Sequence, residues 1–195
     1  MFEPKVFFDL KHYEHQQLFH EDQPIWTVLD RLPAYIDSFF YKSWPLANTS
    51  GQIEKTLVIY NGAVRDDLEV KPTGSKGKIQ VYEKNKILED CAVIMAGACL
   101  FDDQVILGPG TVVEPGALIK GPTVIGNNTE VRQGAYLRGY CLIGDRCVVG
   151  HTTEVKHSVF LDDAKAGHFA YLGDTIIGND ANLGAGTKCA NLRFI

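Results

Sequence analysis

Large apolar residues recur every six positions through the second half of the chain. Stepping by six from Met95 gives an unbroken apolar series: Met95, Phe101, Leu107, Val113, Ile119, Ile125, Val131, Leu137, Ile143, Val149, Val155 and Leu161. A second series runs in the same steps from Cys99 to Val159, and its members are small or β-branched. A helix would show an apolar period near 3.6 and a half-buried strand a period of 2, so neither element explains the pattern.

A period of six with one large and one small apolar position is typical of hexapeptide repeats, in which three short strands make one coil of a three-sided parallel β-helix. We therefore predict a mainly β protein, with a left-handed parallel β-helix over residues 78–195. The apolar series loses its phase after Leu161, because the next clear hexads begin at Ile177 and Leu183. We expect an irregular loop near residues 162–176.

Residues 1–77 lack the hexad pattern, and we predict a small, partly helical cap there. Ile25, Leu29, Leu32 and Ile36 follow helical spacing, with Pro33 expected to kink or divide the helix. The run TLVIY at residues 56–60, followed by Asn-Gly, predicts a strand and a turn. We expect the aromatic residues of this region to cover the open end of the solenoid, which cannot be left exposed.

Lys120, Arg138 and Lys156 follow one another at intervals of three hexads, the length of one coil. Stacked coils are about 4.8 Å apart, so the three cations should form a vertical ladder on one face. Like charges this close repel one another, and a bound anion such as a phosphate would relieve the repulsion. Carboxylates such as Asp102 and Glu154 could instead neutralise a solvated face, and the spacing alone leaves both interpretations open.

Composition excludes several classes of function. The chain has 195 residues, 45% of them hydrophobic, and a formal net charge of -5, which disfavours general binding to nucleic acid or to a membrane surface. The amino-terminal segment lacks the features of a signal peptide, so we predict a cytoplasmic protein. The five cysteines contain no CxxC pair and no zinc-finger spacing to histidine, so we predict no metal site and no disulfides.

The segment from Val149, VGHTTEVKHSVFLDDAKAGHFAYLGDTIIGNDANLGAGT, resembles the acetyltransferase half of a bifunctional bacterial enzyme family. That family is the N-acetylglucosamine-1-phosphate uridyltransferase/glucosamine-1-phosphate acetyltransferases. The shared elements are VG-x3-E-x-K, AGH-x-x-YLGD and N-x-GAGT, within a resemblance over about residues 105–190. The whole chain is similar to shorter relatives, the sugar-nucleotidyltransferase-like (UDP-N-acetylglucosamine pyrophosphorylase-like) proteins, which have a small amino-terminal cap.

The resemblance implies a role for each matching residue. His168 matches the catalytic base that takes a proton from the sugar amine, a role that suits an imidazole. Arg138 and Lys156 match the pair that holds the sugar phosphate, and Tyr171 and Asn182 match residues that contact the sugar. Ala185 lies where the acetyl-CoA site begins. The resemblance also implies a homotrimer with sites at the seams between copies.

Other features keep the function open. The chain has neither a P-loop nor the glycine-rich phosphate-binding loop of a nucleotidyltransferase domain, and KCANLRF follows the GAGT hexad. Because few repeats follow this point, we expect the acetyl-CoA site to be truncated. The sequence therefore leaves three functions: a transferase acting on a sugar phosphate in sugar-nucleotide biosynthesis, a non-catalytic module that binds a sugar phosphate or sugar nucleotide, and a trimeric scaffold.

Overall fold

The computed structural model describes residues 2–39, 41–75 and 78–191. Its helical part is confined to the amino-terminal segment: α1 (Pro4–Phe7), α2 (Thr27–Asp37) and the 3-10 turns η1 (Gln16–Leu18) and η2 (Tyr41–Ser43). Helix α2 continues through Pro33, so the proline does not divide it. Within the described residues, none of the helices has the length and apolar character that a membrane crossing requires.

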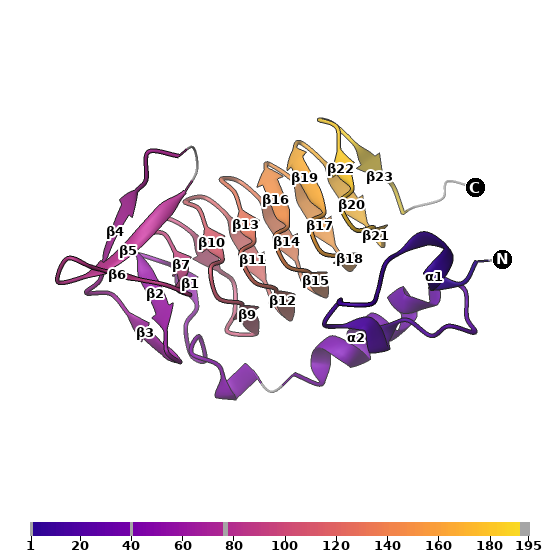
Figure 1. Cartoon of the computed structure of the whole chain (residues 1–195), viewed down its shortest axis with the longest axis horizontal. Coiled ribbons are helices and arrows are strands. Elements are labelled where there is room, and N and C mark those ends of the chain that lie inside the picture. Colours follow the sequence, from indigo (N-terminus) through magenta and orange to yellow (C-terminus); the bar gives the residue numbers. More distant parts are fainter. Residues whose placement is uncertain (1, 40, 76–77, 192–195) are drawn as a thin grey trace.

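Most of the rest of the described chain is a parallel β-solenoid whose strands stack into three sheets (Figure 1). The seven-stranded sheet contains β1 (Gly51–Gln52), β8 (Cys99–Leu100), β11 (Leu118–Lys120), β14 (Tyr136–Arg138), β17 (Glu154–Lys156), β20 (Tyr171–Gly173) and β23 (Lys188–Cys189). The eight-stranded sheet contains β2 (Leu57–Tyr60), β3 (Ala63–Arg65), β7 (Ala92–Ile94), β10 (Val112–Val113), β13 (Glu130–Val131), β16 (Val148–His151), β19 (Lys165–His168) and β22 (Asn182–Leu183). The five-stranded sheet contains β9 (Val105–Leu107), β12 (Thr123–Ile125), β15 (Cys141–Ile143), β18 (Ser158–Phe160) and β21 (Ile176–Ile177).

The predicted hexad core is present from Leu107 to Val155, where every large residue of the series packs inside the solenoid. The series is displaced by one position at both ends. Leu100 and Phe160 fill the interior, whereas Phe101 is 63% exposed and Leu161 faces outward into a second apolar cluster. The small series also holds between these ends, since Cys141 and Cys147 are buried in the core. Burial raises the pKa of each of these two thiols to about 12.

The segment expected to form an irregular loop, residues 162–176, instead continues the solenoid through β19 and β20. Strand β19 pairs with β16, and β20 pairs with β17, both in parallel and both with an offset one position shorter than three hexads. The interior residues show where each coil loses one position. Val155 and Phe160 are one position closer in sequence than a full hexad, and so are Leu172 and Ile177. Both pairs lie across the corner between the seven- and five-stranded sheets, so two successive coils are each one residue short at that corner. A shortened corner, and not a bulge, therefore causes the loss of phase in the sequence.

Antiparallel strands close the end of the solenoid at which its first coil lies. Strand β1 pairs with β8, and the hairpin of β2 and β3, with its turn at residues 61–62, pairs with β7. A further three-stranded sheet lies beside it and contains β4 (Glu69–Pro72), β5 (Ile79–Glu83) and β6 (Lys86–Leu88). The solenoid therefore begins near residue 91 and not at 78.

Residues 2–39 and 41–50, here called the arm, lie mainly along the outer face of the five-stranded sheet (Figure 1), whereas Leu46 near the end of the arm packs into the solenoid core. Tyr13, Val28, Leu32 and Ile36 of the arm pack against outward-facing residues of that sheet. Those sheet residues are Ile106, Val124, Leu142 and Val159. Each buried side chain of this size contributes about 1.5–3 kcal/mol relative to an exposed one, so the contact is strong.

Hydrogen bonds at both ends fix the direction of the arm along the solenoid. The backbone N–H of Asp9 donates to Asn179 Oδ1 in the last coil (3.1 Å). The N–H of Asn48 donates to Asp103 Oδ2 in the first coil (3.1 Å). The arm therefore spans the solenoid from one end to the other and does not cover the outer faces of the other two sheets, although the three-stranded sheet packs on the eight-stranded one at Val58 and Val93.

Candidate functional site

The outer face of the seven-stranded sheet carries two columns of functional side chains. Lys120 is the register partner of Arg138, and the same register places Lys156 beside Arg138 in the next coil. Tyr136, Glu154 and Tyr171 form the second column, two residues earlier in each strand. Leu137, Val155 and Leu172 lie between the columns and point inward, which forces their neighbours outward. The predicted cationic ladder is therefore present.

The three cations of the ladder have different surroundings. The Arg138 guanidinium donates to Glu154 Oε1 at 2.7 Å, as expected for a solvated face. Among the described residues, Asp102 forms no ion pair with these cations, and its two carboxylate oxygens accept the backbone N–H groups of Gln104 and Gly121. Within the described part of the chain, no carboxylate lies within salt-bridge distance of Lys120 or Lys156. Among the described residues, neither lysine beside the Arg138–Glu154 pair therefore has a direct ion-pair partner, although the charge of Lys156 interacts with the Asp174 carboxylate.

A hydrogen-bonded network at the neighbouring corner links the ladder to Tyr171. The Tyr171 hydroxyl donates to Asn191 Oδ1 (3.2 Å), and the Asn191 amide donates to Asp174 Oδ2. His157 Nδ1 lies 2.6 Å from Asp174 Oδ1. Burial acts to raise the pKa of Asp174, but the hydrogen bonds from Asn191 and His157 and the charge of Lys156 outweigh it, so the pKa is lowered. The carboxylate is therefore ionised and fixed beside the ladder.

Sequence reasoning misses this network, although a signal for it exists. His157, Asp174 and Asn191 occupy equivalent corner positions of successive coils, at the spacing of the shortened coils. The regular hexads give His157 no role, place Asp174 in a loop and assign nothing to Asn191. A search at a spacing one position shorter than three hexads aligns the three residues in one column.

His168 lies at a different corner, between the eight- and seven-stranded sheets. It ends β19 directly below His151, its register partner. The backbones of Gly150 and Gly167 approach so closely that a Cβ at Gly150 would overlap the carbonyl of Gly167. His168 is exposed, and its ring contacts that of Phe169 (centroids 6.5 Å apart). Among the residues that the structure describes, neither ring nitrogen of His168 has a hydrogen-bond partner.

The remaining two predicted site residues lie apart from the ladder. Ala185 follows β22 next to His168, since the N–H of Gly186 donates to the His168 carbonyl (3.1 Å). Asn182 begins β22 and is exposed on the outer face of the eight-stranded sheet, because its neighbour Leu183 packs against the core. One copy of the chain therefore brings together Arg138, Lys156 and Tyr171, places His168 and Ala185 at an adjacent corner, and leaves Asn182 on another face.

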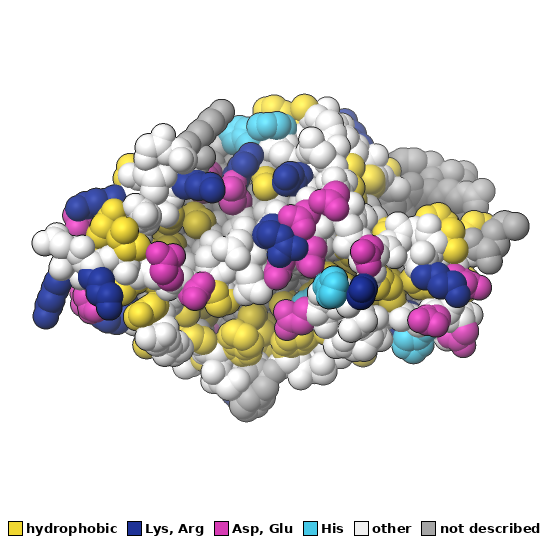
Figure 2. Space-filling view, viewed as in Figure 1, with side chains coloured by type: hydrophobic (Ala, Val, Ile, Leu, Met, Phe, Trp, Pro, Cys, Tyr) yellow, Lys and Arg dark blue, Asp and Glu magenta, His cyan; other side chains and the backbone are white. Residues whose placement is uncertain are grey.

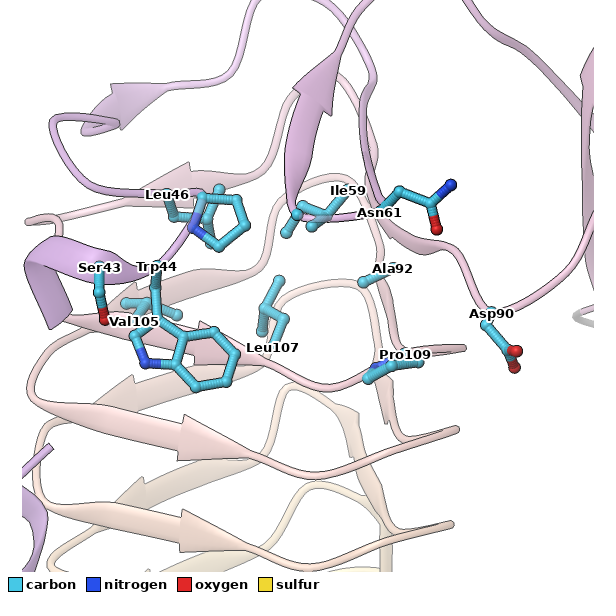
Figure 3. Close-up of a pocket in the computed structure, with 12 residues that line it drawn as sticks. Ser43, Trp44, Leu46, Ile59, Asn61, Asp90, Ala92, Val105, Leu107 and Pro109 are labelled. Atoms are coloured by element: carbon cyan, nitrogen blue, oxygen red, sulfur yellow. The ribbon is translucent and has the colours of Figure 1, made fainter. Parts of the chain in front are cut away.

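An apolar pocket of about 430 Å³ lies elsewhere, at the capped end of the solenoid (Figure 3). Trp44 and Leu46 of the chain after η2, Ile59 of β2 and Leu107 of β9 form its walls. Asp90 is the one charged residue in this lining as far as the chain is described, so the pocket does not suit a phosphate. In the described ranges, no group of three or more His, Cys, Asp or Glu side chains is arranged to hold a metal ion.

Comparisons with known proteins point to one group of enzymes. Residues 119–195 match the family model described as the GMPPB C-terminal domain. The chain is 39% identical over 110 residues to the Bifunctional protein GlmU of Methanococcus maripaludis, covering 56% of this chain and 27% of that protein. It is 35% identical over 115 residues to the GlmU of Stutzerimonas stutzeri, covering 54% of this chain and 25% of that protein.

A shorter match is closer in sequence. The chain is 50% identical over 46 residues to the bifunctional sugar-1-phosphate nucleotidylyltransferase/acetyltransferase of Sulfurisphaera tokodaii, which is 24% of this chain and 12% of that protein. The chain thus spans about a quarter or less of the length of these relatives. The matched family model lies in the solenoid and includes every residue of the ladder and of the corner network.

Proposed function

We propose that this chain, a hexapeptide-repeat protein related to the sugar-phosphate nucleotidyltransferases and acetyltransferases, binds a sugar phosphate on the outer face of its seven-stranded sheet. The observation that carries the proposal is the cationic ladder beside the Tyr171–Asn191–Asp174 network. Guanidinium and ammonium groups on adjacent coils suit a phosphate, and the ordered hydroxyl, amide and carboxylate suit sugar hydroxyls or an amine. Both kinds of group lie on one surface of a rigid scaffold.

In this proposal, Arg138 and Lys156 hold the phosphate and Tyr171 contacts the sugar. Arg138 has the planar fork that binds two phosphate oxygens at once, and it exchanges its contact with Glu154 for the ligand. Lys156 brings a charge that forms no direct ion pair among the described residues. Asn191 and Asp174 act by holding the Tyr171 hydroxyl in place.

The proposed reaction is acetyl transfer from a thioester donor, acetyl-CoA, to the sugar amine. The imidazole of His168 takes a proton from the attacking amine. The new N–C bond forms as the C–S bond breaks, and the imidazolium returns its proton to the leaving thiolate. The exposed backbone at residues 184–186 lies beside His168 and leaves open surface for the donor.

Asn182 reaches this site only from a neighbouring copy, because it faces outward from the eight-stranded sheet. We therefore include a homotrimer in the proposal, with the site at the seam between two copies. Light scattering of the purified protein is expected to give three times the mass of one chain. A monomer would leave Asn182 without a role and would contradict this part of the proposal.

A second function, a binding module without catalysis, is favoured by one observation. The Tyr171 hydroxyl that would contact the sugar is held through Asn191 by Asp174, whereas His168 has no carboxylate to orient it within the described residues. A general base is ordinarily positioned by a hydrogen bond from its second nitrogen. The acceptor side of the site is therefore better ordered than the catalytic side.

The deciding experiment is calorimetric titration with glucosamine-1-phosphate, N-acetylglucosamine-1-phosphate and acetyl-CoA. We expect sugar-phosphate binding that weakens at least tenfold in Arg138→Ala and in Lys156→Ala, since each removes a charged contact worth about 1.5–3 kcal/mol. Arg65→Ala is the matched control, because Arg65 is also an arginine paired with a glutamate (Glu83, 3.0 Å) but lies in β3, at the opposite end of its sheet from Asn182.

The outcomes separate the three functions. Binding of acetyl-CoA together with acetyl transfer that is lost in His168→Ala supports the transferase. Sugar-phosphate binding without acetyl-CoA binding supports the binding module. If none of the three ligands binds, the sugar-phosphate proposal is wrong and a scaffold remains.

A further inference from the structure

Lys120, the first cation of the ladder, is not used by the proposed function. It lies one coil away from Arg138, in register with it. Its ammonium stands over two aromatic rings, 4.6 Å from the centroid of Phe101 and 5.6 Å from that of Tyr136. In the described part of the chain, it has no carboxylate within salt-bridge distance, and Asp102 is occupied by backbone N–H groups. The ammonium of Lys120 is therefore held by contacts with two aromatic rings, and it lies next to the cation of Arg138.

The cation–π contacts hold Lys120 only weakly. Such a contact at an exposed site is worth about 0.5–1 kcal/mol, whereas a charge-assisted hydrogen bond to an anion is worth about 1.5–3 kcal/mol. The side chain of lysine is flexible, so the ammonium can leave the rings when an anion is offered. A phosphate bound next to Arg138 would therefore draw Lys120 away and uncover the face of Phe101.

Phe101 offers the surface that this movement exposes. It is 63% exposed and follows β8 in the coil next to Lys120. Its N–H donates to the Ile119 carbonyl (2.8 Å), which fixes the backbone that presents the ring. Exposed aromatic rings beside cationic groups are stacking platforms for nucleobases, and such stacking tolerates any base because every base has a π-face.

We propose that the ligand surface is longer than a sugar phosphate and accepts a nucleoside diphosphate sugar. This inference rests on the proposed function. Arg138 and Lys156 bind the phosphate next to the sugar, Lys120 binds the second phosphate, and the base stacks on Phe101. The coils are about 4.8 Å apart, so the column from Lys156 to Phe101 covers about 14 Å, which matches an extended diphosphate with its nucleoside.

A polyanion such as a nucleic acid fits this surface less well. The chain has a net charge of -5, and the ladder is a single column of three cations on one sheet. Figure 2 shows that basic and acidic side chains are interspersed over the visible face of the molecule. The positive charge therefore matches a diphosphate and not a continuous phosphate backbone.

The test compares two ligands that share the same sugar. Calorimetric titrations with N-acetylglucosamine-1-phosphate and with UDP-N-acetylglucosamine are expected to show about tenfold tighter binding of the sugar nucleotide, the gain that one further charged contact gives. Lys120→Gln and Phe101→Ala are each expected to reduce sugar-nucleotide affinity about five- to tenfold and to leave sugar-monophosphate affinity unchanged. GDP-mannose tests whether the platform accepts a purine.

Controls keep the inference apart from the proposed function. Lys86→Gln removes an exposed lysine from the three-stranded sheet at the capped end and is expected to change neither affinity. Equal affinities for the two ligands, or an equal loss of both in Lys120→Gln, would overturn the inference while the sugar-phosphate site stands. If neither ligand binds, both proposals are overturned.

Discussion

At the residue scale, spacing alone locates part of the candidate site. Arg138 and Lys156 can be paired from the sequence because three hexads make one regular coil and the two lie in successive coils. Asp174 and Asn191 cannot, because each follows a shortened coil and so leaves the regular column. The contact of Lys120 with two rings also lies beyond the pattern, since it depends on the direction in which a flexible side chain turns.

Glycine at position 150 is required by the close approach of two strands. Gly150→Ala is expected to destabilise the protein by about 1–3 kcal/mol, the usual cost of overpacking, because the new Cβ would overlap the carbonyl of Gly167. Denaturant unfolding measures the change. Gly167→Ala is the matched control, since a Cβ there would meet no atom within 4 Å. Equal effects of the two substitutions would show that the strands do not approach in this way.

At the scale of the element, the hexad pattern predicts the strands and the shape of their cross-section, but not the lengths of the corners. Leu161 continues the apolar series at a step of six, which assigns it to the interior. The coil loses one residue before β18, so Phe160 takes the interior position and Leu161 faces the arm. Both residues are large and apolar, so no property of Leu161 itself marks the change.

A substitution of Leu161 is expected to affect the arm and not the solenoid. Leu161→Ser should release the arm, because it places a hydroxyl in the apolar contact with the arm and leaves the solenoid interior unchanged. Limited proteolysis measures this as faster cleavage within residues 2–50 while the repeats stay protected. Leu172→Ser is the comparison, since Leu172 lies in the solenoid core, and it should expose the repeats as well. A Leu161→Ser protein that loses protection of the repeats would place Leu161 in the interior.

At the scale of the whole molecule, the sequence predicts a solenoid with an amino-terminal cap but not which surface the helical part covers. A signal for that surface exists in the repeats. Ile106, Val124 and Leu142 recur once per regular coil on the outward side of the five-stranded sheet, and Val159 follows after a shortened one. An outward apolar column on a solenoid face requires a cover, because monomeric surfaces seldom leave such a stripe exposed.

Docking of the arm is expected to weaken in acid. Burial lowers the pKa of His15 below its usual 6.5, while Glu14, Asp145 and Asp162 act in the opposite direction. As the pH falls, His15 therefore binds a proton at a higher pH in the released arm than in the docked arm. Docking is strongest above pH 6.5 and weakens as the pH falls toward the lowered pKa. Hydrogen exchange of residues 2–39 between about pH 7.5 and 5.5, corrected for the intrinsic rate, measures the effect.

His15→Gln is the control for this pH dependence. The glutamine can keep a hydrogen bond to the Tyr35 hydroxyl, which lies 2.8 Å from His15 Nδ1, but it does not titrate. The variant is expected to show a flatter change in protection of the arm with pH. An unchanged profile would assign the acid response to other groups.

The position of the arm has a consequence for symmetry. A closed ring of identical subunits uses two different surfaces on every copy, one facing each neighbour. A three-sided prism without the arm would offer three such surfaces, so its copies could pack in several alternative arrangements. Because the arm occupies one side, two sides remain, and the edge where those two meet is the corner that carries His151 and His168. Any such ring built from this chain would have that histidine edge facing its axis or its outer rim.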